Sequence, residues 1–170
     1  MKRIHCVSSF EIPLPPAQAI QLFTPEGERL WAGEDWDPRY PVALATGATG
    51  AERGTVFVTG EDDAATIWVA MGNDAESVTY ARVTPRTMAG IVSVRCTPAG
   101  TEATTVEVTY EVTSLTDAAD AQLDEFAQHY DAFIASWEQE LQAVGLDGLR
   151  SRLGRRAARP ERGSPGGRDG

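Results

Sequence analysis

Polar and apolar residues alternate near the start of the chain and then change their spacing. Over residues 3–12, one set of alternate positions is mostly apolar and the other mostly polar, which is typical of a half-buried β-strand. The first set comprises Ile4, Cys6, Ser8, Phe10 and Ile12. Prolines end this run, and apolar residues at helical spacing over 17–23 predict a short helix. Thr24-Pro25-Glu26 predicts a second short helix, because Thr caps a helix and Pro fits its first turn.

Further strand-like runs follow at regular intervals. They cover residues 55–59, 65–71, 77–84, 88–97 and 102–113. The connections between them are short and rich in Gly, Pro and Asp, which favours antiparallel pairing of neighbouring strands. In the last run, Val106, Val108, Tyr110 and Val112 alternate with polar residues. One face of the predicted sheet is therefore packed and the other is solvated.

An amphipathic helix is predicted over residues 117–144, where apolar residues recur at every third or fourth position. The apolar stripe comprises Leu123, Phe126, Ala127, Tyr130, Phe133, Ile134, Trp137, Leu141 and Val144. One continuous helix of this length would measure about 40 Å and cross the whole sheet. We therefore expect an α+β fold. It would consist of a curved antiparallel sheet of about six or seven strands wrapped on a long C-terminal helix, with two short helices after the first strand.

Several segments resemble a known superfamily. They are Phe23-Thr24-Pro25-Glu26-Gly27-Glu28-Arg29-Leu30-Trp31 with Trp36-Asp37-Pro38, then Tyr80-Ala81-Arg82-Val83-Thr84-Pro85, and the stretch from Tyr130 to Trp137. The sequence is similar here to the START-related superfamily known as SRPBCC, which groups polyketide cyclases, lipid-transfer domains and plant allergen-like proteins. The resemblance covers about residues 1–146. It implies a helix-grip fold with a cavity between the concave sheet and the helix, in which family members hold apolar molecules.

Side chains on the predicted inner surfaces are candidates for the wall of such a cavity, and ordinary core packing is the alternative for each aromatic ring. The candidate ligand-binding residues are Trp36, Tyr80, Arg82, Val108, Tyr110, His129, Tyr130, Phe133 and Trp137. Trp31 and Trp68 are further candidates. Trp68 is ambiguous, because the apolar residues on either side of it belong to the opposite face of its strand.

Two of these candidates carry ionisable groups. Arg82 shares a strand face with Val78 and Tyr80, so its guanidinium is predicted to enter the cavity and to orient an anionic or carbonyl-bearing ligand. An Arg at the rim that reaches solvent is the alternative. His129 lies one step from the apolar stripe and could act as a general base, but no residue at local spacing would orient it. A histidine at the boundary of the stripe is the alternative, and no catalytic residue is assigned.

Composition fits a single domain with a basic extension. The chain has 170 residues, of which 42% are hydrophobic. Residues 1–149 hold 8 Lys and Arg against 23 Asp and Glu, whereas residues 150–170 hold 7 Arg against 2 acids. An acidic body repels phosphate backbones, which argues against nucleic-acid binding by the domain. We expect a START-like helix-grip domain over residues 1–146 and a disordered Arg/Gly/Pro-rich tail over residues 147–170.

Other classes of protein are excluded by what the sequence lacks. Polar residues interrupt the apolar run after Met1, so neither a signal peptide nor membrane insertion is predicted. Cys6 and Cys96 lie in strand-like runs, where reduced buried thiols are common. The histidines and acidic turns have no metal-binding spacing. We expect a cytoplasmic monomer or homodimer without a metal or cofactor.

These observations favour a small-molecule binding protein over an enzyme. The expected ligand is an apolar or amphipathic molecule such as a lipid, a polyketide or an aromatic compound, held between the sheet and the C-terminal helix. An enzyme of the polyketide cyclase or dehydratase kind is the alternative, in which Arg82, His129 and tyrosine hydroxyls would polarise carbonyl groups. A second alternative is a module that regulates a partner protein, like the Hsp90-activating members of the superfamily.

Overall fold

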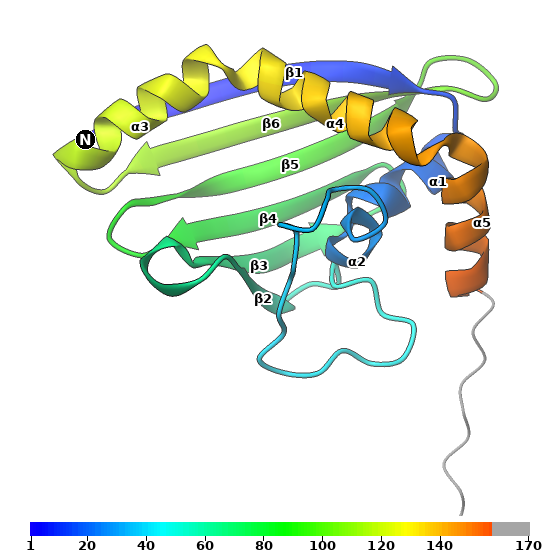
Figure 1. Cartoon of the computed structure of the whole chain (residues 1–170), viewed down its shortest axis with the longest axis horizontal. Helices are drawn as coiled ribbons and strands as arrows, with labels where there is room; N and C mark the ends of the chain where they lie inside the picture. Colours follow the sequence, from blue (N-terminus) through cyan, green and yellow to red (C-terminus); the bar gives the residue numbers. More distant parts are fainter. Residues whose placement is uncertain (158–170) are drawn as a thin grey trace, which may run out of the picture.

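Six antiparallel strands form one curved sheet in the computed structural model, which describes residues 1–157 (Figure 1). The strands are β1 (Arg3–Ile12), β2 (Val56–Thr59), β3 (Thr66–Asn73), β4 (Ser77–Thr84), β5 (Met88–Pro98) and β6 (Thr104–Ser114). Their order across the sheet is β1-β6-β5-β4-β3-β2. The first strand thus pairs with the last, and the strands from β2 to β6 form a meander. The predicted α+β architecture is confirmed.

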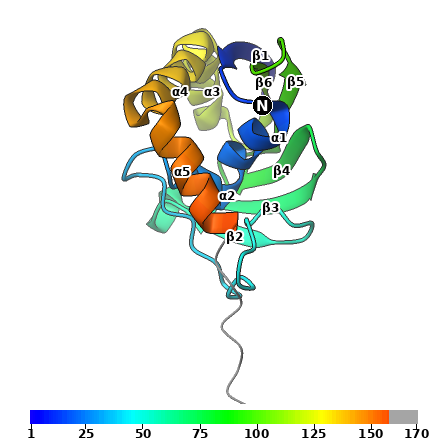
Figure 2. The same ribbon diagram turned by 90° about the vertical axis from the view of Figure 1, so that its right-hand side faces the viewer.

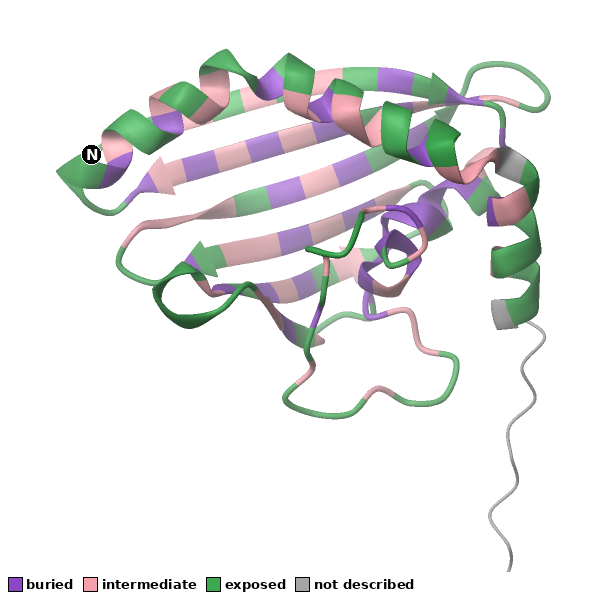
Figure 3. Cartoon of the chain, viewed as in Figure 1, coloured by how far each residue is buried: buried purple, intermediate pink, exposed green. Residues whose placement is uncertain are grey.

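The alternation of side chains decides which face of the sheet is covered. Phe10 and Ile12 in β1 and the valines of β6 are buried, whereas the residues between them are mostly exposed or partly exposed (Figure 3). The helices α3 (Asp117–Gln128) and α4 (Tyr130–Val144) lie over the buried, concave face at the edge formed by β1 and β6 (Figure 1). The apolar face that the sequence predicts is therefore the face that the helices cover.

Short helices follow β1, as the spacing predicts. They are α1 (Pro16–Ala19), the 3-10 helix η1 (Ile20–Phe23), α2 (Pro25–Glu28) and, later in the chain, the 3-10 helix η2 (Asp62–Ala64). Thr24 caps α2, because its Oγ1 accepts a hydrogen bond of 3.0 Å from the backbone N–H of Gly27. Leu22 and Phe23 are completely buried. This burial fixes α2 against the sheet and orients the side chain of Glu28.

The long C-terminal helix is broken at His129, and the prediction of one continuous helix was wrong. His129 has φ −104° and ψ 9°, outside the helical range, and it separates α3 from α4. The apolar stripe nevertheless continues across the break, because Phe126, Tyr130 and Phe133 contact one another and Tyr110 of β6. The Tyr130 hydroxyl also donates a hydrogen bond of 2.8 Å to the Val108 carbonyl oxygen. The break lets the two helices remain packed on a curved surface.

A further helix, α5 (Leu146–Ala157), occupies the first part of the segment that was expected to be a disordered tail. Leu149 is completely buried, and Leu153 packs against the core one helical turn later. Arg150 donates to the Pro13 carbonyl oxygen at 3.3 Å, and Arg152 donates to the Leu30 carbonyl oxygen at 3.1 Å. The helix therefore lies beside α1 and α2 (Figure 2), and the folded unit continues past residue 146. The rest of the expected tail, residues 158–170, lies outside the described residues.

No helix within residues 1–157 is sufficiently long and apolar to cross a membrane.

Candidate ligand-binding cavity

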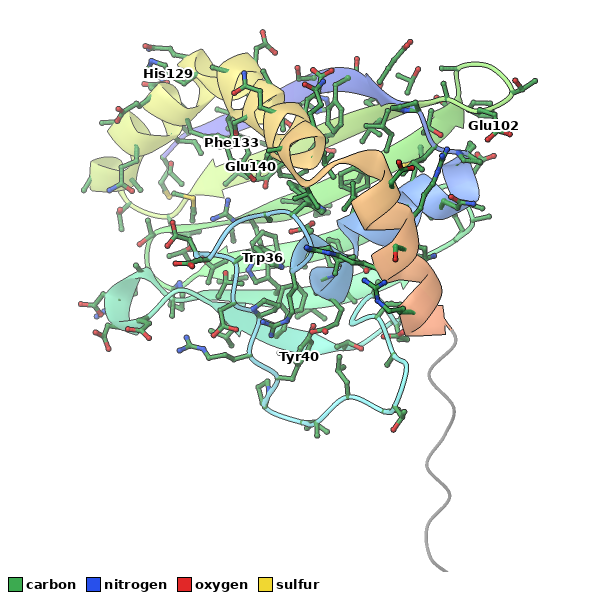
Figure 4. The ribbon with its side chains drawn as sticks, turned by 45° about the vertical axis from the view of Figure 1, so that its right-hand side comes forward. Trp36, Tyr40, Glu102, His129, Phe133 and Glu140 are labelled. Atoms are coloured by element: carbon green, nitrogen blue, oxygen red, sulfur yellow. The ribbon has the colours of Figure 1, made fainter. Side chains whose placement is uncertain are left out.

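A cavity of about 350 Å³ lies between the concave face of the sheet, α2, α4 and the chain that follows α2. Its volume falls within the range of roughly 300–1,000 Å³ that is usual for small-molecule sites. Trp36 approaches from the segment after α2 and Phe133 from α4 (Figure 4). The lining residues are Pro25, Glu28, Trp31, Ala32, Asp35, Trp36, Phe57, Trp68, Tyr80, Arg82, Val92, Val94, Tyr110, Phe133, Ser136, Trp137 and Glu140.

Aromatic rings form most of the wall, and all 4 tryptophans of the chain belong to it. Three of them are fixed by hydrogen bonds from their indole N–H groups. Trp31 donates to the Leu22 carbonyl oxygen at 2.8 Å, Trp36 to the Pro25 carbonyl oxygen at 2.9 Å, and Trp68 to Thr59 Oγ1 at 2.9 Å. Because the polar edge of each ring is satisfied by the protein, the apolar surface of the ring remains available to the cavity.

Arg82 brings a cationic group into this aromatic surrounding. Its guanidinium carbon lies 5.3 Å from the centre of the Trp68 ring and 6.0 Å from that of Tyr110, within the range of cation–π interactions. Its Nε is buried and has no hydrogen-bond partner. Burial lowers the pKa of the guanidinium, and the Tyr110 phenol opposes that shift. An arginine does not lose its proton in a protein, so the cavity contains a positive charge that the aromatic rings balance only in part.

Glu28 faces the cavity from the last position of α2 and is only 9% exposed. No ion pair joins its carboxyl group to any of the residues described, Arg82 included. Burial raises the pKa of the Glu28 carboxyl well above its usual value of 4.5, because desolvation disfavours the charged form. A protonated carboxyl group donates one hydrogen bond and also accepts, so in its protonated form Glu28 offers a polar partner without adding a second full charge.

Two tyrosines complete the polar part of the wall. The Tyr80 hydroxyl donates to the Phe23 carbonyl oxygen at 3.2 Å, which connects β4 to η1. Burial raises the pKa of both Tyr80 and Tyr110, and the Arg82 charge opposes the shift at Tyr110. Both phenols therefore remain protonated at neutral pH. They act as neutral hydrogen-bonding groups and not as bases.

The structure brings together six of the residues that the sequence singles out. Trp36, Tyr80, Arg82, Tyr110, Phe133 and Trp137 line the cavity, as do Trp31 and Trp68. Val108 and Tyr130 are buried in the adjoining core and do not line the cavity. His129 is exposed at the break between α3 and α4, where its Nδ1 lies 2.9 Å from the Glu125 carbonyl oxygen (Figure 4). Its side chain therefore cannot act on a molecule inside the cavity.

Glu28 is the functional candidate that sequence reasoning missed. In the sequence it appears as one of several acids near the start of a capped helix, where acids are common because they complement the helix dipole. The available signal was its position four residues after Thr24 and three before Trp31, which places it on the same side of the helix as these two residues. Only the packing of α2 against the sheet reveals that this side is buried.

Replacing Glu28 with glutamine is expected to stabilise the protein at neutral pH and to change its stability little in acid. A carboxyl group whose pKa is raised on folding contributes stability fully below its usual pKa of 4.5, and this contribution is lost as the pH rises through the folded pKa. The midpoint of thermal unfolding should therefore exceed that of the native protein by a margin that grows above about pH 4.5. Glu34→Gln, which makes the same change at an exposed acid nearby, is the matched control.

Comparisons with known proteins find similarity at the level of structure. No family model matches the chain, and no curated protein matches it. The Aha1 dimer from Colwellia psychrerythraea has a TM-score of 0.59 at 14% identity, over 85% of this chain and 98% of that one. Norcoclaurine synthase from Thalictrum flavum, in complex with dopamine and hydroxybenzaldehyde, has a TM-score of 0.56 at 10% identity, over 80% and 84%. The chain has the helix-grip fold. CalU16 from Micromonospora echinospora agrees with this result at a TM-score of 0.54 and 11% identity, over 93% and 98%.

These neighbours confirm the fold that the resemblance to the SRPBCC superfamily implies. At such low identities, the similarity establishes the fold and does not transfer an activity. The chemistry of the site therefore has to come from the residues that line the cavity of this chain.

Proposed function

We propose that this protein binds a small, largely apolar molecule with an aromatic or amphipathic character in the helix-grip cavity. The observation that carries this proposal is an aromatic cavity of about 350 Å³ that contains the Arg82 guanidinium, whose buried Nε has no hydrogen-bond partner. A core built only for stability gains nothing from such a group, because an unpaired buried charge costs free energy. A binding site gains a polar contact that orients its ligand.

The comparison structures support this proposal in a general way. Norcoclaurine synthase, a protein of this fold, has been solved in complex with dopamine and hydroxybenzaldehyde, two small aromatic molecules. The four tryptophans, Phe57 and Phe133 give the present cavity a surface that suits ring-shaped molecules. The enzymatic alternative stays a prediction. Its proposed groups Arg82, Tyr80 and Tyr110 lie at the cavity, whereas its proposed base His129 does not.

The first test is whether a neutral aromatic probe enters the cavity. Native mass spectrometry of the untreated protein would first give the mass of any retained ligand. The protein would then be stripped of bound small molecules on a hydrophobic resin. Naphthol would then be titrated by calorimetry and by tryptophan fluorescence. Because every tryptophan of the chain lines the cavity, we expect binding to change the emission strongly.

Filling the cavity is expected to weaken this binding. Val92 lies in the wall, whereas its neighbour Ile91 lies on the same strand but is 42% exposed on the outer face of the sheet. Val92→Phe should weaken naphthol binding by about tenfold or more, since it removes the space that the ring occupies. Ile91→Phe makes the same addition outside the cavity and should leave the affinity unchanged. Equal affinities in the two variants would place the bound probe elsewhere.

A further inference from the structure

On the concave face of the sheet, Arg82 has a glycine as its neighbour on one adjacent strand. Arg82 of β4 pairs with Trp68 of β3 on one side and with Gly90 of β5 on the other. Trp68 contacts the guanidinium from its side, Gly90 has no side chain to cover it, and the Tyr110 ring of β6 lies 6.0 Å from it. Arg82 lines the cavity between these two rings.

No carboxylate of the described residues lies close enough to pair with Arg82. Its buried neighbours are aromatic, and its Nε remains without a partner. Two exposed carboxylates, Asp35 and Glu140, line the cavity at its rim (Figure 4). Neither of them forms an ion pair with Arg82. Rim charges act through water and are screened by salt, whereas a desolvated guanidinium interacts strongly with an oxyanion placed against it. The interior of the cavity thus favours an anion at this point.

Glu28 provides a second polar position from another wall. It belongs to α2, whereas Arg82 belongs to the sheet, and the two side chains form no ion pair. Its carboxyl group is buried and faces the cavity. In its protonated form it donates a hydrogen bond to a carbonyl or hydroxyl oxygen. Because the two residues line the cavity from different elements, the cavity presents two polar positions within a mainly aromatic wall.

We infer that the ligand is an aromatic acid, with an oxyanion bound by Arg82 and a hydroxyl or carbonyl oxygen at its other end bound by Glu28. This inference rests on the proposed function, because it specifies what the same cavity binds. The tryptophan and phenylalanine rings contact the aromatic body of the ligand, Arg82 selects its charge, and Glu28 selects its orientation. An aromatic molecule with a cationic amine in place of the acid is excluded from the Arg82 position by repulsion between like charges.

Matched probes separate this inference from binding in general. At neutral pH, calorimetry would give the affinities of naphthol, naphthoate and a hydroxynaphthoate with its two polar groups at opposite ends of the ring system. The native protein should bind naphthoate at least about tenfold more tightly than naphthol, because a hydrogen-bonded charge pair contributes more than a neutral contact. The hydroxynaphthoate should bind more tightly still.

Two substitutions assign these preferences to residues. Arg82→Met should remove the preference for naphthoate over naphthol, whereas Arg95→Met, at an exposed arginine on β5, should preserve it. Glu28→Leu should remove the gain from the extra hydroxyl, and Glu28→Gln, which still donates a hydrogen bond, should retain it. The midpoint of thermal unfolding verifies that each variant is folded. Arg82→Met is expected to fold, because methionine fills a similar space without burying a charge.

The outcomes are distinct. If naphthol binds and naphthoate binds no better, or if Arg82→Met preserves the preference for naphthoate, the inference of an acid is overturned while the proposed function stands. If only the Glu28 variants have no effect, the two-point recognition is overturned. If none of the three probes binds to the stripped protein, both the inference and the proposed function fall.

Discussion

A Gly90→Ala protein is expected to be less stable than the native protein by about 3 kcal/mol, near the upper end of the usual cost of overpacking. A Cβ atom at this position would lie 2.0 Å from the Glu111 carbonyl oxygen and 2.7 Å from the Val112 Cα atom. Both are backbone atoms of β6, the strand that pairs with β5, so they cannot move aside as a flexible side chain could. The sheet would have to separate or change its curvature at this point.

Chemical denaturation followed by circular dichroism would measure this loss. Gly148→Ala is the matched control, because a Cβ atom there would meet only the Val144 Cγ1 atom, at an ordinary 3.9 Å, within a helical segment. Alanine should stabilise that position by about 0.5–1 kcal/mol. If Gly90→Ala instead differed from the native protein by less than about 0.5 kcal/mol, the close approach of the two strands would not be a property of the protein in solution.

Leu149→Ala is expected to lower the free energy of unfolding by about 2–4 kcal/mol, which would establish α5 as part of the folded domain. Leu149 is completely buried, and its removal would leave a cavity between α5 and the elements that it covers. The unfolding transition should remain a single step, since α5 shares the core with the rest of the chain.

Arg155→Ala, on an exposed part of the same helix, serves as the comparison and should change the stability by less than about 0.5 kcal/mol. Equal stabilities of the Leu149 and Arg155 variants would mean that α5 contributes little to the fold. The expectation of a tail from residue 147 onward would then apply in solution.

The sheet could be predicted from the sequence because its pattern is local. Alternation in β1 and β6 and the short turns between the other strands indicate both the strands and their antiparallel order. The break at His129 could not be predicted, since Phe126, Tyr130 and Phe133 keep the spacing of an uninterrupted helix. The break leaves the apolar stripe intact, so the pattern of the sequence contains no sign of it.

The helix α5 was missed for a different reason. Its arginines and glycines resemble a disordered segment, and the two leucines that hold it, Leu149 and Leu153, form a stripe too short to predict a helix. The segment becomes a helix because α1 and α2 present a surface for it. Composition describes the segment alone and contains no information about that surface.

The candidate site was predictable where a residue belongs to a strand, because side chains alternate between the two faces of the sheet. Arg82 shares the inner face with Val78 and Tyr80, so its direction could be read from the sequence. Glu28 gives no such signal, because α2 is only 4 residues long and too short for a periodic pattern. The Val108 side chain points to the concave face, as predicted. That direction alone does not distinguish a packed core residue from one that borders a cavity.

The pairing of the first strand with the last has a consequence for synthesis on the ribosome. Arg3 pairs with Thr113 and Ile12 with Thr104, so β1 leaves the ribosome long before its partner exists. At about 5–20 residues per second, the wait lasts for several seconds. During that time the hairpins of β2 to β5 can assemble from local contacts, whereas the apolar side chains of β1 remain exposed. The strand that is made first is therefore the last to enter the sheet, and the nascent chain is most prone to aggregation until β6 has been translated.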